Sequence, residues 1–311
     1  MKIGILTTNQ IDEDNRLIEA ATARGHDIKR VELKKCSVRV SSEGAAVYYE
    51  GEDITTAYDI IIPRLNVSHT GYGLAILRQF QAMDVYVTDT AYSIELGRDK
   101  LRCLQYLLRS NIPFPKTGFA DSTDDFQNII ASIGGAPLVL KLIEGTEGTG
   151  VFLVNDVKEA ENIKATCKQF DTPVIVQEFI EESKGSDIRC FVVGDKVVAT
   201  MKREAQDDDF RANVSLGGHS ETEILTPEEE AIAINAAKAI ELNVAGVDMI
   251  RSDRGPLILE INVSPDFCGE QGIESVTGVD VAGAIIDHAF HRKIEFDKGH
   301  GVWLQEQSQA N

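Results

Sequence analysis

The stretch of this chain that most constrains its fold runs from Gly246 to Pro265 and reads GVDMIRSDRGPLILEINVSP. Two short apolar runs, Ala245–Arg251 and Pro256–Val263, flank the turn-forming residues Ser252-Asp253-Arg254-Gly255. Apolar runs of strand length on either side of such a turn predict a β-hairpin. We therefore expect two antiparallel strands in this part of the chain.

The predicted hairpin brings three oxygen-bearing side chains together. Glu260 and Asn262 point to the same side because side chains alternate along a strand, and Asp248 on the partner strand can face them. Two bare carboxylates about 4 Å apart repel by roughly 4 kcal/mol at an effective dielectric of about 20, so a positive charge is expected between them. Carboxylate and amide oxygens without His or Cys suit Mg²⁺ or Mn²⁺, and Mg²⁺ often accompanies nucleotide phosphates. The alternative is an ordinary hairpin whose carboxylates face water.

Length and charge narrow the class of protein. A chain of 311 residues is expected to form two or three domains. Its net charge of −19 argues against non-specific binding to nucleic acid or to anionic membranes, so neither is expected as a partner. The five cysteines are scattered and without CxxC spacing, and no 18 apolar residues run together. Reduced thiols and a cytoplasmic location are the expectation.

The remaining sequence alternates strand-like and helix-like segments. The first 90 or so residues predict a small open α/β sheet that begins with a parallel β-α-β unit. The two prolines Pro113 and Pro115 mark a boundary before a second α/β unit. Thr226 and Glu229 form a capping box at a helix start, and the last dozen residues are expected to be frayed. The predicted strands are 2–7, 27–33, 47–49, 58–63, 85–88, 137–142, 151–154, 174–180, 187–193 and 196–202, and the predicted helices include 12–24, 72–83, 99–110, 157–170 and 279–292.

A glycine-rich segment, Lys141–Gly150, follows one of the predicted strands. Its three glycines and two threonines provide backbone N–H groups that can surround phosphate oxygens, and Lys141 adds positive charge. The segment is not a Walker A motif, because no Gly-Lys-Ser/Thr closes it. A plain hairpin turn is the alternative. The backbone of Gln177–Ile180, at the end of a later strand, can offer an adenine base one donor and one acceptor.

Several arginines lie near predicted strand ends in this otherwise acidic chain. Arg189, Arg203 and Arg211 can hold phosphoryl oxygens or a substrate carboxylate. With Lys202 they are expected to form a small basic pocket for an acceptor carboxylate. The alternative is surface ion pairing, which is the usual role of such residues.

Taken in order, these motifs resemble those of the RimK family of ATP-grasp ligases. The resemblance covers residue 1 to about residue 290 and implies an α/β (α+β) ATP-grasp fold. It divides the chain into an N-terminal open α/β pre-ATP-grasp domain (1–96), a central lid subdomain (97–178), a C-terminal metal-bearing subdomain (179–292) and a tail (293–311). The matching residues are Lys100, Lys141, Gln177-Glu178-Phe179, Asp187-Ile188-Arg189, Phe210-Arg211-Ala212-Asn213, Gly246-Val247-Asp248 and Glu260-Ile261-Asn262.

The resemblance also implies a role for each matching residue. The nucleotide would be bound by Lys100, by Lys141 on its phosphates, by Glu178 and Phe179 at the adenine and by Asp187 at the ribose. The phosphate and acyl-phosphate end would be lined by Arg211, Ala212 and Asn213, with Arg203 beside them, and Arg203 and Arg211 are the expected catalytic residues. Two Mg²⁺ or Mn²⁺ ions would be held by Asp248, Glu260 and Asn262, with Glu260 bridging them.

The activity that the resemblance implies is an ATP-dependent, ADP-forming addition of L-glutamate to an acceptor carboxylate through an acyl phosphate. The expected acceptor is the acidic C-terminus of a small-subunit ribosomal protein, and the expected assembly is a homo-oligomer, a tetramer as in many family members. Two alternatives stay open: a ligase for a small-molecule or cofactor acceptor, and a nucleotide-binding regulator without turnover.

The chain departs from the family pattern in two places. After Pro265 the segment Asp266–Glu274 is longer by three residues than is typical of the family, and Gln206-Asp207-Asp208 makes the loop before Asp209 acidic. Both changes lie where substrate rather than ATP is expected to bind, so they bear on the acceptor and not on the ligase chemistry.

Overall fold

The computed structural model describes residues 1–8, 11–143, 150–183, 185–206, 210–212 and 218–310. Its first part is an open sheet of parallel strands in the order β2-β1-β6-β7. All but the first residue of β1 are buried, as expected for a strand covered on both faces. The predicted β-α-β opening is confirmed. The elements of this part are β1 (Lys2–Thr7), α1 (Ile11–Ala23), β2 (Asp27–Glu32), β6 (Ile60–Arg64), the 3₁₀ turn η2 (Val67–His69), α2 (Thr70–Ala82) and β7 (Tyr86–Val87).

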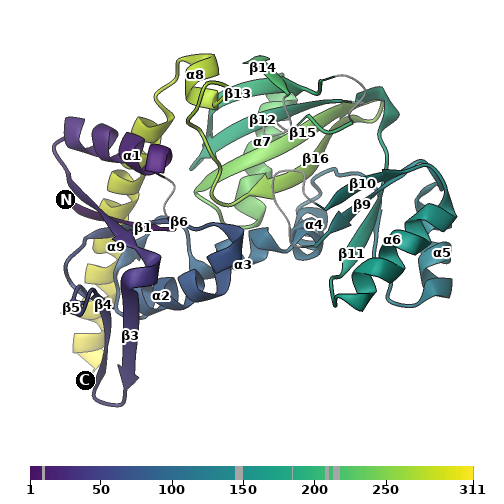
Figure 1. The fold of residues 1–311 in the computed structure, drawn as a ribbon. Coiled ribbons are helices and arrows are strands. Elements are labelled where there is room, and N and C mark those ends of the chain that lie inside the picture. Colours follow the sequence, from purple (N-terminus) through teal and green to yellow (C-terminus); the bar gives the residue numbers. More distant parts are fainter. Residues whose placement is uncertain (9–10, 144–149, 184, 207–209, 213–217, 311) are drawn as a thin grey trace.

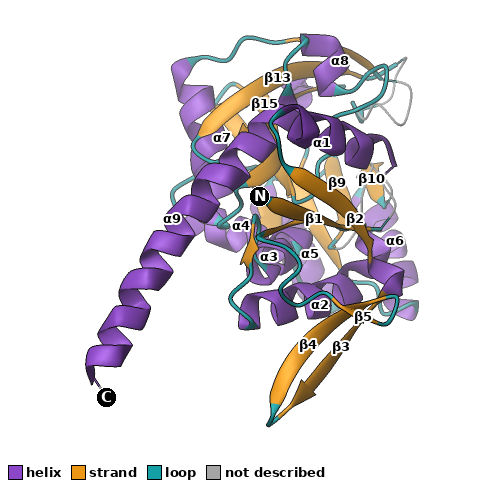
Figure 2. Ribbon diagram, turned by 90° about the vertical axis from the view of Figure 1, so that its left-hand side faces the viewer, coloured by secondary structure: helices purple, strands orange, loops and turns teal. Residues whose placement is uncertain are grey.

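A small antiparallel sheet projects from this open sheet (Figure 2). The predicted strand at 47–49 exists, but it belongs to this projection and not to the open sheet, which corrects the sequence-based assignment. Its partner strand was not predicted, because five of its six residues are exposed and form no buried run. The elements are the 3₁₀ turn η1 (Leu33–Lys35), β3 (Cys36–Ser41), β4 (Gly44–Tyr49) and β5 (Glu52–Asp53).

Two consecutive helices lead into the second part, α3 (Ala91–Arg98) and α4 (Lys100–Arg109). Their N-caps, Thr90 and Asp99, each accept a hydrogen bond from the backbone three residues on. The second part is a sheet in the order β10-β9-β11-β8 with two helices on one face (Figure 1). Its elements are β8 (Thr117–Gly118), α5 (Thr123–Ile133), β9 (Leu138–Leu142), β10 (Val151–Val154), α6 (Val157–Gln169) and β11 (Val174–Glu178).

The third part is an antiparallel sheet in the order β14-β13-β12-β15-β16. The predicted hairpin forms β15 and β16, and the capping box of Thr226 and Glu229 opens α7 as expected. The last helix continues to Ala310, through the residues expected to be frayed, since helix formers such as Leu, Gln and Glu without proline follow Arg292. The elements are the 3₁₀ turn η3 (Glu181–Ser183), β12 (Ser186–Val193), β13 (Lys196–Glu204), β14 (His219–Thr222), α7 (Pro227–Ala239), β15 (Val244–Ser252), β16 (Gly255–Asn262), α8 (Ile273–Thr277) and α9 (Val281–Ala310).

The first and third parts are joined by polar contacts as well as by packing. Arg16 on α1 lies 2.8 Å from Glu274, and Arg24 lies 2.7 Å from Asp287 on α9. The buried Asp89 accepts hydrogen bonds from the backbone N–H groups of Asn243 and Val244. All five cysteines are free. Within the described residues, no helix combines the length and apolar character needed to cross a bilayer. The mixed α/β architecture is the fold class expected from the sequence.

Candidate active site

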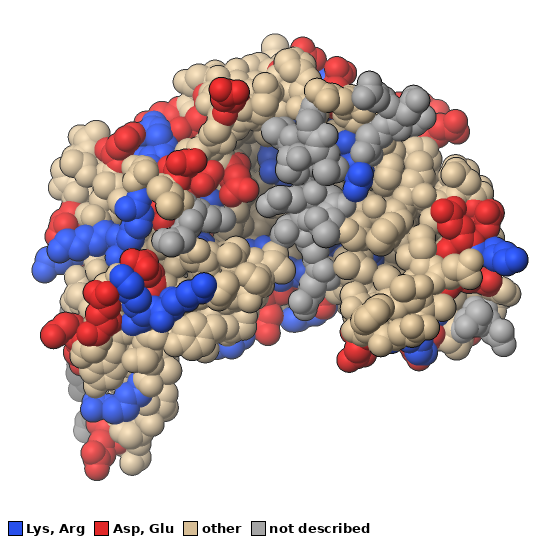
Figure 3. Space-filling model, in the orientation of Figure 1, with Lys and Arg blue, Asp and Glu red and all other residues tan. Residues whose placement is uncertain are grey.

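The main cavity lies between the second and third sheets and encloses about 790 Å³ of space, part of it open to solvent. Around it the face of the molecule is hollowed, and acidic and basic side chains alternate on the surface (Figure 3). The predicted site residues that line this cavity are Lys141, Glu178, Phe179, Asp187, Arg203, Arg211, Ala212, Asp248 and Glu260.

A second, smaller cavity adjoins the first at Glu260, which lines both. Lys100 and Asn262 line this second cavity, together with Arg98 at the end of α3. The two cavities therefore meet at one carboxylate on the hairpin strand β16.

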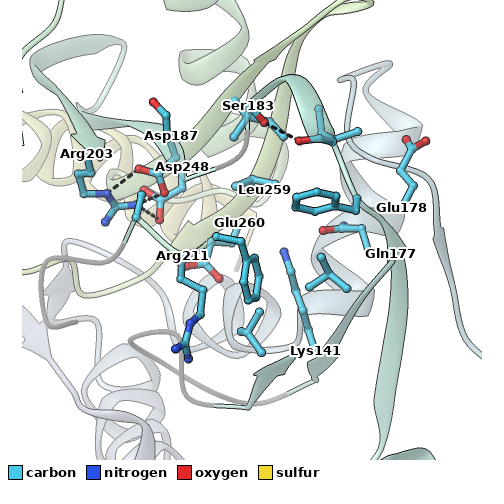
Figure 4. A pocket seen from close by; sticks show the side chains of 18 residues that line it. Lys141, Gln177, Glu178, Ser183, Asp187, Arg203, Arg211, Asp248, Leu259 and Glu260 are labelled. Carbon is cyan, nitrogen blue, oxygen red and sulfur yellow. Dashed lines mark hydrogen bonds and ion pairs between the residues drawn. The ribbon is translucent and has the colours of Figure 1, made fainter. Parts of the chain in front are cut away.

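Four charged residues form a largely buried network on one side of the main cavity, and Figure 4 shows three of them, Arg203, Asp187 and Asp248. Arg203 donates from Nε and Nη2 to Asp187 at 2.7 and 2.6 Å, and Arg189 donates from the same two atoms to Asp248 at 2.7 and 2.6 Å. Arg203 Nη2 also lies 3.0 Å from Asp248 Oδ2. The network follows from the sheet register, in which Arg203 pairs with Asp187 and Arg189 with Asp248.

The network determines the protonation of its members. Burial opposes ionisation of Asp248, but Arg189 and Arg203 outweigh it and hold the pKa of that carboxyl well below its usual range. Burial also disfavours the charged form of Arg203, yet Asp248 and Asp187 raise the pKa of its guanidinium. Two cations and two anions therefore share one dry region and balance each other in charge.

The hairpin oxygens converge as predicted, but one premise of that prediction was wrong. Asp248 is the register partner of Glu260, and Asn262 Nδ2 donates to Asp248 Oδ2 at 3.2 Å. The positive charge expected beside Asp248 is supplied by Arg189 and Arg203, so the Asp248 carboxylate does not by itself require a metal ion. Glu260, in contrast, makes no hydrogen bond or ion pair to any described residue. A half-buried carboxylate beside a carboxamide fits a hard cation.

Two lysines lie within electrostatic range of Glu260. Lys141 is 8% exposed at the centre of the sheet, paired with Val151 and Ile175, and points into the cavity (Figure 4). Burial lowers its pKa, while Glu260 raises it and nearby Lys100 lowers it. A buried lysine near a second lysine is suited to bind an anion, because an added negative charge offsets the repulsion between them.

At the opposite side of the cavity, Phe179 follows directly on the end of β11. Its ring meets that of Phe210 edge to face, with centroids 6.4 Å apart. The side chain of Glu178 points away from the cavity, where its carboxylate accepts from Lys116 N and from Arg254 (Figure 4). A contact from Glu178 to a base in the cavity would therefore come from its backbone.

Other sequence-based predictions have mixed outcomes. Arg211 and Ala212 line the cavity, with Arg211 directed away from Asp187 and Asp248 in Figure 4.

Lys202 was wrongly assigned to a basic pocket with Arg203. Neighbouring strand residues face opposite sides, and Lys202 pairs with Glu204 and Glu221 instead. Asn213, Asp207, Asp208 and most of the glycine-rich loop (144–149) lie outside the described residues.

The sequence reasoning placed Arg189 in a basic pocket for an acceptor carboxylate and did not anticipate that it pairs with Asp248 in the network beside Asp187. The signal was available, because residues 187 and 189 are two apart on a strand and must face the same side. Arg254 was also missed. It lies in the hairpin turn, and nothing in the local sequence indicates that it reaches Glu178 on another sheet.

Solved structures with this overall architecture are ATP-grasp ligases. A RimK domain ATP-grasp protein from Sphaerobacter thermophilus superposes with a TM-score of 0.70 at 24% identity, covering 93% of this chain and 99% of that one. The D-alanine–D-alanine ligase from Bacillus anthracis gives 0.66 at 18% identity, covering 96% and 99%. At these identities the comparison establishes the fold, which is the ATP-grasp fold.

Sequence relatives identify the family to which the chain belongs within the ATP-grasp fold. Residues 97–289 match the RimK-like ATP-grasp domain and residues 1–94 match the RimK pre-ATP-grasp domain. A probable alpha-L-glutamate ligase from Pseudoalteromonas translucida is 47% identical over 300 residues, 96% of this chain and 98% of that protein. One from Coxiella burnetii is 49% identical over 288 residues, 92% and 94%. The chain belongs to the RimK-like ATP-grasp family.

Proposed function

We propose that this protein is an ATP-dependent alpha-L-glutamate ligase that joins L-glutamate to an acceptor carboxylate through an acyl phosphate. The observation that carries the proposal is the meeting of two cavities at Glu260, one between the second and third sheets and one lined by α3, α4 and β16. The names of the relatives support it, as does a solved ATP-grasp ligase, PsnB, that holds its minimal precursor, magnesium and ADP.

For the nucleotide we propose the following placement. The base lies between Phe179 and Phe210, against the backbone of Glu178, and the ribose lies toward Asp187. The phosphates extend to Lys141 and Lys100. Arg211, Ala212 and Asn213 line the far end. The division of the chain at residues 96, 178 and 292 also remains our prediction, with the central unit closing over ATP.

For the metal we propose Glu260, Asn262 and Asp248 as ligands of Mg²⁺ or Mn²⁺, with Glu260 shared between two ions. A bound divalent ion would neutralise charge on the phosphates and on the transferring group. The fit is best at Glu260, whose carboxylate has no partner among the described residues, and at Asn262, whose amide N–H groups face Asp248 and Gly246. Asp248 can bind the metal ion only if one of its carboxylate oxygens accepts from Arg203 or Arg189 and coordinates the ion at the same time.

The proposed chemistry has two displacements. An oxygen of the acceptor carboxylate attacks the terminal phosphorus of ATP and ADP leaves. The amine of glutamate then attacks the acyl carbon, loses a proton, and phosphate leaves as the amide forms. Arg203 and Arg211 are placed to hold the oxygens of the phosphoryl group, and the protein contributes mainly position and charge.

The test is a screen of ADP release over amino acids and acceptors. We expect release to require L-glutamate and an acceptor with a free carboxylate, and phosphorus NMR to show ADP and phosphate. AMP and pyrophosphate would rule out the mechanism. A peptide ending in an acidic ribosomal-protein tail should be the better acceptor than small carboxylic acids. Light scattering tests the expected tetramer.

A further inference from the structure

Two arginines outside the nucleotide cavity, Arg64, which is buried, and Arg98, which is partly exposed, lie where the first sheet meets the hairpin. Arg64 is the last residue of β6 and only 2% exposed, and Arg98 is the last residue of α3. Arg64 Nη1 donates to the carbonyl of Pro265 at 3.0 Å, and Arg98 Nη2 donates to the carbonyl of Leu65. Each guanidinium thus has only one hydrogen bond for its five N–H groups in the described part of the chain.

Three further guanidinium nitrogens of these arginines lack a hydrogen-bond partner among the described residues. They are Nε and Nη2 of Arg64 and Nε of Arg98, and all three atoms are buried. The nearest carboxylate oxygen, Asp266 Oδ1, is 3.6 Å from Arg64 Nη2 and belongs to a side chain that is 61% exposed. Asp14 and Asp89 also act on Arg64 electrostatically, but neither hydrogen-bonds it.

The two guanidinium groups repel each other, although Asp14, Asp89 and Asp266 act on them in the opposite sense. Burial, and then repulsion from Arg64, lower the pKa of Arg98 to about 10, while Asp266 opposes the shift. An unpaired buried charge costs several kcal/mol, and the cost falls when an anion of matching shape is bound. The flat fork of a guanidinium matches a carboxylate.

The location connects the two arginines to the proposed reaction. Pro265, which Arg64 binds, is three residues beyond Asn262, a distance of at most about 10 Å along the chain. Arg98 lines the second cavity together with Glu260, Asn262 and Lys100. Arg64 also stands at the carboxyl end of a parallel strand, where open α/β sheets usually bind ligands. The nucleotide cavity lies on the other side of Glu260.

We propose that Arg64 and Arg98 bind a carboxylate of the incoming amino acid, one that takes no part in bond formation. The inference rests on the proposed function, since glutamate brings such carboxylates. It assigns the anion to the incoming amino acid rather than to the acceptor, because the acceptor carboxylate must reach the ATP phosphate in the main cavity. Asp266, on the segment that is longer than in the family, stands at the exposed side of this anion site.

Arg64→Gln and Arg98→Gln test this site, because glutamine keeps an N–H donor for the carbonyl that each arginine holds. We expect KM for L-glutamate to rise about 10- to 100-fold, the value of a lost charged hydrogen bond. KM for ATP should stay within twofold, and kcat should fall less than KM rises. Isothermal titration with L-glutamate in the presence of ADP should show the same loss of affinity.

Three comparisons make the outcome decisive. Arg16→Gln removes another arginine that links the first and third parts, through Glu274 and Asp280, and should leave every constant unchanged. The preference of the wild-type enzyme for glutamate over its neutral amides, glutamine and isoglutamine, should shrink in the two variants. Arg64→Lys, which keeps the charge but not the fork, should give an intermediate KM.

The result that overturns the proposal is a KM for glutamate unchanged in both variants, or equal losses for ATP and glutamate, which would show a purely structural role. If the wild-type enzyme releases ADP with glutamate and both variants keep the wild-type KM for glutamate, the anion site is refuted while the proposed function stands. Wild-type enzyme that never uses glutamate refutes the proposed function, and this assignment with it.

Discussion

Replacing Arg203 with Met should be among the more destabilising single changes in this protein. The side chain of Arg203 is 4% exposed and makes two charged hydrogen bonds to Asp187 and a 3.0 Å ion pair with Asp248. Without it, Asp187 is left as a buried carboxylate without its bidentate partner, while Asp248 keeps Arg189. Breaking a buried pair in this way costs about 3–5 kcal/mol, mostly from the charge left behind.

A matched control exists in the same sheet. Arg251 binds Glu229 with similar geometry, at 2.6 and 3.1 Å, but it is 48% exposed. Glu229 is only 5% exposed, but it keeps the hydrogen bond from Thr226 N, and solvent screens the Arg251 end of the pair, so Arg251→Met should cost less than Arg203→Met, about 1–2 kcal/mol. Urea unfolding of both variants at pH 7, followed by far-UV circular dichroism, gives the two free energies of unfolding.

The pH dependence separates lost charge from lost packing. If the cost of Arg203→Met comes from an unpaired Asp187, protonating that carboxyl should relieve it, so the difference from wild type should shrink as the pH falls toward 4. Arg203→Met combined with Asp187→Leu should also recover part of the stability. The reasoning is refuted if Arg203→Met costs no more than Arg251→Met, or if its cost is the same at pH 4 and pH 7.

Three further outcomes are expected. Burial raises the pKa of Asp89 to about 6, so the folded state holds its proton more tightly than the unfolded chain. Between pH 4 and pH 7 the wild type should therefore lose about 2 kcal/mol of unfolding free energy relative to Asp89→Asn, measured with urea, and parallel curves would contradict this. Glu260→Gln should abolish ADP release with the fold intact by circular dichroism; retention of more than about a tenth of kcat, a barrier change under roughly 1.4 kcal/mol, would exclude the bridging role. Lys141→Met should weaken ADP binding in titration calorimetry without changing glutamate affinity, whereas equal losses would place both ligands at Lys141.

Much of the fold was predictable because its signals are local. Alternation of side chains and a tight turn predicted the hairpin and the shared face of Asp248, Glu260 and Asn262. The capping box at Thr226 and the opening β-α-β unit were equally local. The failures have local causes too. β3 buries too little to show a pattern, and composition alone did not reveal that α9 continues to Ala310.

The sequence by itself determined which residue types stand two apart on a strand, and hence that Asp187 and Arg189 share a face. Only the tertiary structure decided their partners, because the order of strands in a sheet is set by packing between distant segments. That order puts Arg189 on Asp248, 59 residues away, and so supplies the counter-charge that sequence reasoning assigned to a metal. It also places Arg64 on the carbonyl of Pro265, 201 residues away, within electrostatic range of Arg98.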